Sequence, residues 1–159
     1  MTTHTPRTML VAVFVALAFL APLNRAQGPQ NKSTVEQELV RTEFGFFQAW
    51  KAKDLAYFRE HIPDNGIFWS DAGTFSRDDQ LEHQPTSPKN CTVDGYSLSE
   101  FGVLQLAAGT YLLTYKAEQY ATCSGDKLPL HINGSSLYIL KQGRWQSVYR
   151  AEVSLKNQG

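Results

Sequence analysis

The chain has 159 residues, 15 basic and 15 acidic side chains, and no formal net charge at neutral pH. A length of this order is typical of a single globular domain with one hydrophobic core. Because the basic residues form no cluster, the composition excludes nucleic acid and anionic membranes from the expected partners.

The first 26 residues have the pattern of a secretory signal peptide. Arg7 supplies a positive charge, residues 9–23 are almost entirely apolar, and Ala26 ends a short stretch suited to cleavage. This apolar run is shorter than the about 20 residues that a membrane span requires. We therefore expect cleavage near Ala26, export to the periplasm or the medium, and no membrane span in the mature chain. Residues 27–33 read as a flexible leader, and residues 34–159 as one domain.

Three helices are predicted in the N-terminal half. Residues 34–53 carry apolar side chains at helical spacing. Asp54 has the position of an N-cap for a second helix over residues 55–61, and Ser76 has that position for a third over residues 77–83. The side chains of the first helix that we expect to face solvent are its charged ones: Glu36, Glu38, Arg41, Glu43, Lys51 and Lys53.

Strands dominate the rest of the chain. Residues 67–70 and 74–75 predict two short strands before the third helix. Residues 92–106 and 110–122 predict two long strands joined by a tight turn. The long pair therefore forms a hairpin that supplies much of one sheet.

The two cysteines flank this long hairpin. The midpoint between Cys91 and Cys123 is residue 107, which falls in the turn at residues 107–109, so we expect the two thiols to lie nearly opposite each other at the open end. An even pair in an exported chain indicates a disulfide. Gly95 and Gly102 are candidate β-bulges that adjust the register and curve the sheet.

The last hairpin, residues 135–153, closes at a two-residue turn of Gln142 and Gly143. If Lys141 pairs with Arg144, strict alternation defines two faces. One face carries aromatic and hydroxyl-bearing side chains suited to a cavity wall: Ser136, Tyr138, Leu140, Trp145, Ser147, Tyr149 and Ala151. The opposite face carries the others: Leu137, Ile139, Lys141, Gln146, Val148, Arg150 and Glu152.

Helices early in the chain and a meander of strands late in it define an α+β class. We expect a strongly curved antiparallel or mixed sheet that forms a cone, with the three helices as its roof. The interior of such a cone is the natural place for a small-molecule pocket.

Two segments resemble a known superfamily. Residues 36–70 (EQELVRTEFGFFQAWKAKDLAYFREHIPDNGIFWS) look like the opening of a nuclear-transport-factor-2-like (NTF2-like) domain, and residues 135–149 (SSLYILKQGRWQSVY) look like its closing hairpin. The detail is similar to the SnoaL-like group, which contains many exported proteins of unknown function. This resemblance covers essentially the whole mature chain and implies the ketosteroid-isomerase-like fold. Because the superfamily includes isomerases, cyclases, dehydratases, transport adaptors and assembly domains, the resemblance implies no single activity.

Isomerases of this superfamily use a strand carboxylate as base, with a tyrosine and a protonated aspartate as oxyanion donors. Here Asp71 precedes a turn at residues 72–73, and alternation places Glu118 and Glu152 on the outer face. His131 lies in the loop before the last hairpin and reaches the pocket if that loop folds over the cone. Asp71 and His131 are therefore the catalytic candidates, although the isomerase triad does not map onto this chain residue by residue.

The sequence indicates no cofactor. No two histidines or cysteines have metal-ligand spacing, so no metal site is predicted. The chain also has no nucleophile elbow, phosphate loop or dinucleotide fingerprint.

Three functions remain open. The first is an exported domain that binds a small apolar molecule, and the second is an enzyme of the isomerase, cyclase or dehydratase type with Asp71 or His131 as proton shuttle. The third is a homodimer through the convex sheet face, where Leu137, Ile139 and Val148 supply apolar surface; it is compatible with the first. The residues expected to line the pocket are Trp69, Tyr115, Tyr138, Trp145 and Tyr149. The alternative for each of these aromatic side chains is that it fills the core.

Overall fold

The structure is a computed structural model, and it describes residues 32–155. The predicted signal peptide and its cleavage near Ala26 lie outside the described residues. Of the predicted leader, Lys32 and Ser33 belong to the first helix. No helix within residues 32–155 is long and apolar enough to cross a membrane.

The helices α1 (Lys32–Ala52), α2 (Leu55–His61) and α3 (Arg77–Glu82) agree closely with the predicted ranges. The carboxylate of Asp54 accepts hydrogen bonds from two backbone amides in the first turn of α2. The hydroxyl of Ser76 accepts one from the first turn of α3. Both predicted N-caps are therefore present, and each satisfies amides that the helix leaves unpaired.

One mixed sheet contains all the described strands. These are β1 (Ile67–Ser70), β2 (Gly73–Ser76), β3 (Cys91–Ala107), β4 (Thr110–Cys123), β5 (Asp126–Lys127), β6 (His131–Lys141) and β7 (Arg144–Ser154), with a short 3₁₀ helix η1 (Pro88–Asn90) before β3. The strand order is β2-β1-β7-β6-β4-β3, and β5 pairs with β4. Strands β1 and β7 are parallel, whereas the other pairs are antiparallel.

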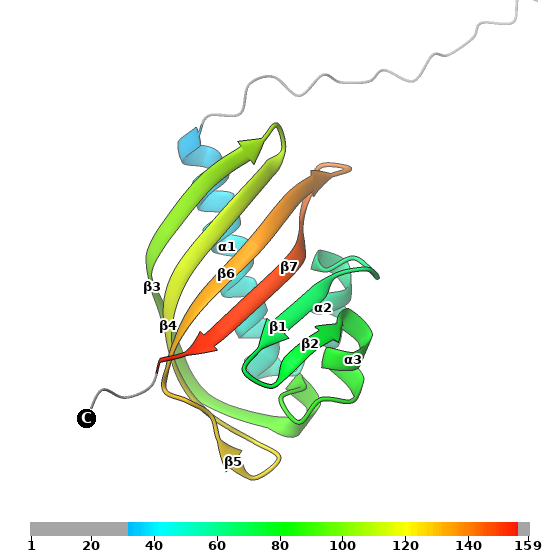
Figure 1. The fold of residues 1–159 in the computed structure, drawn as a ribbon, viewed down its shortest axis with the longest axis vertical. Helices are drawn as coiled ribbons and strands as arrows, with labels where there is room; N and C mark the ends of the chain where they lie inside the picture. The colour runs from blue at the N-terminus through cyan, green and yellow to red at the C-terminus, as the bar shows by residue number, and fades with distance from the viewer. Residues whose placement is uncertain (1–31, 156–159) are drawn as a thin grey trace, which may run out of the picture.

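The sheet curls around α1, which runs behind it in Figure 1, while α2 and α3 lie beside β1 and β2. The predicted α+β cone is confirmed. We call the face of the sheet toward α1 the inner face and the opposite one the outer face.

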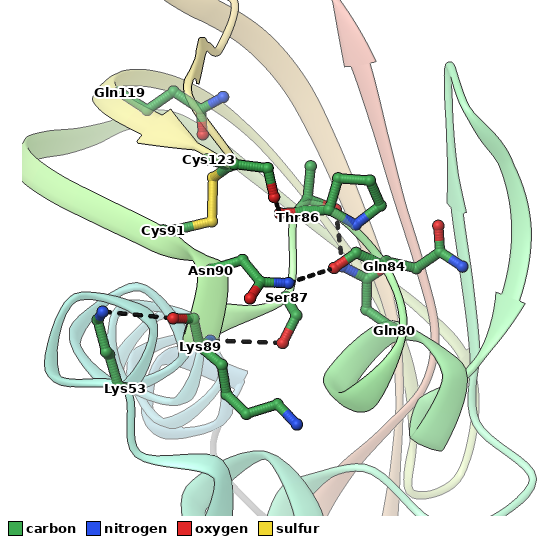
Figure 2. Close-up of a disulfide and its surroundings, with 12 residues drawn as sticks. Lys53, Gln80, Gln84, Thr86, Ser87, Lys89, Asn90, Cys91, Gln119 and Cys123 are labelled. Atoms are coloured by element: carbon green, nitrogen blue, oxygen red, sulfur yellow. Dashed lines mark hydrogen bonds between the residues drawn. A yellow bond between two sulfur atoms is a disulfide. The ribbon is translucent and has the colours of Figure 1, made fainter.

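The predicted disulfide is confirmed at the open end of the β3–β4 hairpin. Cys91 and Cys123 are direct cross-strand partners, and their sulfur atoms are 2.02 Å apart. The register of the two strands shifts next to Gly95 and again next to Gly102, as the bulge prediction required. Figure 2 shows the disulfide beside the loop that precedes β3.

The predicted register of the last hairpin is right near the turn and wrong beyond it. Leu140 pairs with Trp145, and Tyr138 with Ser147, as expected. A β-bulge then leaves Val148 without its own partner, so that Leu137 pairs with Tyr149. Because an inserted residue reverses the alternation of everything after it, all later side chains of β7 exchange faces.

The exchange brings Arg150 to the inner face, where it is 4% exposed, and puts Tyr149, 36% exposed, on the outer face. Arg150 meets Glu43, which is 0% exposed. The prediction that Glu43 faces solvent is therefore wrong. Glu43 comes four residues after the buried Leu39 and three before the buried Phe46, so it belongs to the inward stripe of α1.

A buried ion pair thus joins α1 to β7. Glu43 Oε1 lies 2.7 Å from Arg150 Nη2, and Tyr138 Oη donates a hydrogen bond of 2.6 Å to Glu43 Oε2. Burial acts to lower the pKa of Arg150, but Glu43 and, to a smaller extent, Tyr115, Tyr138 and Glu152 together more than offset this effect, so the pKa lies above its ordinary value. The pKa of Tyr138 is also raised well above its usual range, first by burial and then by the Glu43 charge. Both groups therefore stay protonated at physiological pH.

Removing one charge of this pair leaves the other buried without a counter-charge. We expect Glu43→Gln to lower the free energy of unfolding by about 3–5 kcal/mol. The double variant Glu43→Gln/Arg150→Met contains no buried charge of the pair, so its loss should fall clearly short of the sum of the two single losses. Urea denaturation of all four proteins measures this coupling.

The matched control is Glu118→Gln, since Glu118 is half-exposed and pairs only loosely with His131 at 3.8 Å. This change should alter the free energy of unfolding by no more than about 0.5 kcal/mol. If the losses in free energy of unfolding of the two single variants add up to the loss of the double variant, the assigned role of the pair is contradicted.

Candidate functional site

A cavity of about 270 Å³ lies inside the cone, between α1, α2, α3 and the inner face of β1 and β7. Its volume is close to the lower end of the range, about 300–1,000 Å³, in which small-molecule sites fall. Most of its wall is apolar and aromatic: Phe46, Phe47, Trp50, Phe58, Phe68, Trp69, Leu81, Pro88, Leu128, Pro129 and Ile132.

Part of the wall is polar, and hydrogen bonds hold some of its side chains in place. It consists of Ser70, Asp71, Gln80, Thr86, Gln119, Arg150, Glu152 and Ser154. Gln119 is 6% exposed and its amide donates to the carbonyl of Pro129 at 3.0 Å, which holds the β4 side of the wall in place. Gln80 donates to the hydroxyl of Thr86 at 3.1 Å.

Arg150 forms part of the cavity wall through a guanidinium that is already engaged. Its Cζ atom lies 4.3 Å from the ring centre of Phe46 and 6.0 Å from that of Phe68. Such stacking is favourable for a guanidinium and adds to the ion pair with Glu43. Arg150 is therefore held from two sides, by a carboxylate and by aromatic rings.

Glu152 also lies at the cavity, so the prediction that it faces outward is wrong. The bulge at Val148 turns it inward, where it is a cross-strand partner of Ser70. Tyr115 Oη donates to Glu152 Oε1 over 3.4 Å, and Arg150 Nη2 lies 3.6 Å from the same oxygen. The Glu152 side chain keeps 39% of its surface exposed, so part of the carboxyl faces the open space.

The pKa of Glu152 is raised above its ordinary value. Burial is the largest cause, Arg150 acts in the opposite direction, and the Glu43 charge adds to the rise. Burial also raises the pKa of Tyr115 well above its usual range. The site thus presents a carboxyl that protonates more readily than usual, backed by a neutral phenol.

Two of the predicted site residues border the cavity. Asp71 lies at its edge and accepts a hydrogen bond from the backbone amide of Ser154 at 3.2 Å, so it ties the turn after β1 to the end of β7. Trp69 also borders the cavity, but it alternates with the half-buried Phe68, and its side chain is 40% exposed.

The other predicted aromatic residues lie elsewhere. Tyr138, 0% exposed, and Trp145, 6% exposed, pack in the core under the first half of α1. Their polar atoms are bound by that helix: Tyr138 by Glu43, and Trp145 Nε1 by Glu38 at 2.8 Å. In this part of the cone α1 fills the interior, and the aromatic rings serve as core.

Tyr115 is 3% exposed and lies behind Glu152 rather than at the cavity surface. A Cβ atom on Gly134 would come within 2.0 Å of its ring, so only glycine leaves room for it there. Tyr149 is on the outer face because of the bulge, and the proposed pocket contact of its side chain has no geometric basis.

His131 is the first residue of β6 rather than part of a loop. It pairs with Glu118 on the outer face, while its neighbour Ile132 turns toward the cavity. Of the two predicted proton shuttles, Asp71 therefore borders the cavity and His131 does not. Glu152, whose carboxyl was not among the predicted site residues, lies deeper.

The disulfide supports one side of the cavity. Pro88 and Thr86 of the cavity wall belong to the segment directly before Cys91, and Figure 2 shows this segment packed beside the bond. The side-chain Nδ2 of Asn90 donates to the carbonyl of Gln84 at 3.1 Å, and the backbone amide of Ser124 donates to the carbonyl of Asn90 at 2.9 Å. The loop is thus closed on itself and tied to the residue that follows β4. Within the described residues, no group of three potential metal ligands is gathered.

No family model matches this sequence. No curated protein matches it either.

Solved structures do match its fold. One is an NTF2-like protein from Cytophaga hutchinsonii, with a TM-score of 0.68 and 13% identity over 79% of this chain and 100% of that one. Another is a ketosteroid isomerase-like protein from Erwinia carotovora atroseptica, with a TM-score of 0.64 and 16% identity over 80% of this chain and 99% of that one. A third, a putative calcium/calmodulin-dependent kinase II association domain from Exiguobacterium sibiricum, has a TM-score of 0.66 and 12% identity over 81% and 98%.

At these identities the likeness establishes architecture and leaves function open. It agrees with the resemblance found in the helices and the closing hairpin of the sequence. The chain has the NTF2-like, ketosteroid-isomerase-like fold.

Proposed function

We propose that this protein binds a small, mainly apolar molecule in the cavity between α1 and the inner face of the sheet. The observation that carries the proposal is that α1 fills only part of the cone. Around Tyr138 the interior is solid, whereas beyond Phe46 and Phe58 an aromatic wall encloses about 270 Å³ of open space. Apolar concave sites with a few placed polar groups are the usual form of small-molecule sites.

The proposal includes an extracytoplasmic setting. The N-terminal segment predicts export, and the Cys91–Cys123 disulfide is compatible with an oxidising compartment. The disulfide also anchors one wall of the cavity, so the ligand site and the compartment are linked through the same bond.

The substitution Ser70→Trp should fill the cavity. Ser70 lines it from the inner face of β1, opposite Glu152. We expect at least one of 1-octanol, octylamine and octanoate to raise the thermal midpoint of the wild-type protein by several degrees, because a ligand at 100 times its Kd adds about 2.7 kcal/mol to stability. Ser70→Trp should abolish this rise, as measured by differential scanning calorimetry.

The matched control is Thr74→Trp, which introduces the same side chain at an exposed position of the adjacent strand β2. It should leave the ligand-induced rise unchanged. If none of the three probes stabilises the wild-type protein, the binding proposal is wrong.

The outer face supports a further function, the homodimer that was the third of the possibilities left open by the sequence. Its outer apolar row, formed by Leu104, Leu112, Leu137, Tyr149 and Ile67, runs across five strands as consecutive cross-strand partners. Leu104 is 58% exposed and Ile67 43% exposed. Of the residues first expected in this interface, Leu137 belongs to the row, while Ile139 and Val148 are half-buried beside it. A second copy of the chain would remove this row from water.

A charge in the centre of the row should prevent this association. We expect Leu137→Asp to convert a dimer of the wild-type protein into a monomer, since an unpaired carboxylate buried at an interface costs several kcal/mol. Sedimentation velocity measures the change, and Thr92→Asp, an exposed position near the disulfide, is the control. A wild-type protein that stays monomeric at high concentration would refute the homodimer.

A further inference from the structure

We infer that the ligand of the cavity carries a positive charge: it is a small organic amine whose ammonium group contacts Glu152 and whose apolar part lies among the aromatic rings. This inference rests on the proposed binding function and names the class of molecule that the cavity selects.

The first support is the balance of charge around the cavity. Of the described residues that line it, Arg150 is the one cation, and Asp71 and Glu152 are the acids. The charge of Arg150 is already matched by Glu43, which contacts it at 2.7 Å from the core side. The wall itself therefore has an excess of negative charge, and a cation entering the cavity supplies the missing counter-charge.

The second support is the loose attachment of Glu152. Its contacts with Tyr115 and Arg150 are long, 3.4 Å and 3.6 Å, and both reach the same oxygen, Oε1. The 39% of its side-chain surface that remains exposed gives a ligand access to the carboxyl. Asp71 contributes less, because it lies exposed at the edge of the cavity and already binds the amide of Ser154.

The third support is the aromatic wall. Arg150 already stacks on Phe46, but Phe47, Trp50 and Phe58 present further ring surface to the cavity. Aromatic faces attract ammonium groups, and indole does so most strongly. A carboxylate and a set of aromatic rings around one cavity match the two ends of an amphiphilic amine.

The opposite charge fits this wall poorly. An anionic ligand would approach Glu152 and Asp71, and the guanidinium that would attract it is already paired with Glu43 and stacked on Phe46. A neutral ligand would leave the excess charge of the wall uncompensated. The inference therefore predicts an order of affinity: ammonium first, then the neutral group, then carboxylate.

Three probes of equal chain length test this order: octylamine, 1-octanol and octanoate. Isothermal titration calorimetry of the purified wild-type protein should give a Kd for octylamine at least tenfold lower than that for 1-octanol, with octanoate the weakest. In Glu152→Gln the preference for octylamine over 1-octanol should shrink to less than threefold.

Glu118→Gln is the control, because it removes a half-exposed carboxylate from the outer face of the same sheet. It should keep the tenfold preference. Equal binding of octylamine and 1-octanol, or tighter binding of octanoate, overturns the amine inference and leaves the binding function standing. Binding of none of the probes overturns both. The wild-type comparison decides between these results even if Glu152→Gln folds poorly.

Discussion

The ion pair between Glu43 and Arg150 is the constraint on which the rest of the structure depends. Two charges removed from water cost several kcal/mol each, and only close geometry with further partners offsets that cost. Here Tyr138 binds the carboxylate, and the ring of Phe46 covers the guanidinium. Because the two charges must meet, the pair holds α1 against β7 at this point. The helix therefore fills one part of the cone and leaves the other part hollow.

The chemistry of the cavity follows from this arrangement. Arg150 lies on the inner face, but its charge is paired with that of Glu43. Glu152 therefore determines the polar character of the cavity. Its carboxyl stands next to a guanidinium and a phenol, both of which have raised pKa values and stay protonated. A wall of aromatic rings with one accessible carboxyl can both exclude water and distinguish ligands by charge. The proposed binding and the proposed selectivity therefore both depend on the same buried pair.

The two faces of the sheet differ in what they present. The inner face holds the core and the cavity, whereas the outer face presents an apolar row across five strands. The β-bulge at Val148 determines this division on β7, because it moves Tyr149 to the outer row and Arg150 and Glu152 to the inner face. At the other end of the sheet the disulfide holds together β3 and β4, and with them the loop that closes the cavity.

The sequence by itself determined the features that depend on local pattern: three helices, two of them with their N-caps, the long hairpin with its disulfide, the turn at Gln142 and Gly143, and hence the α+β cone. The sequence also contained a signal that Glu43 is buried. Glu43 follows Leu39 by one helical turn and therefore lies on the buried stripe of α1. Only the tertiary structure decided which residues form the site. One extra residue in a strand reverses every later side chain, and no local propensity marks Val148 as that residue. Whether Tyr138 and Trp145 line a cavity or fill a core likewise depends on where α1 lies, and that position is set by a contact between residues more than 100 positions apart.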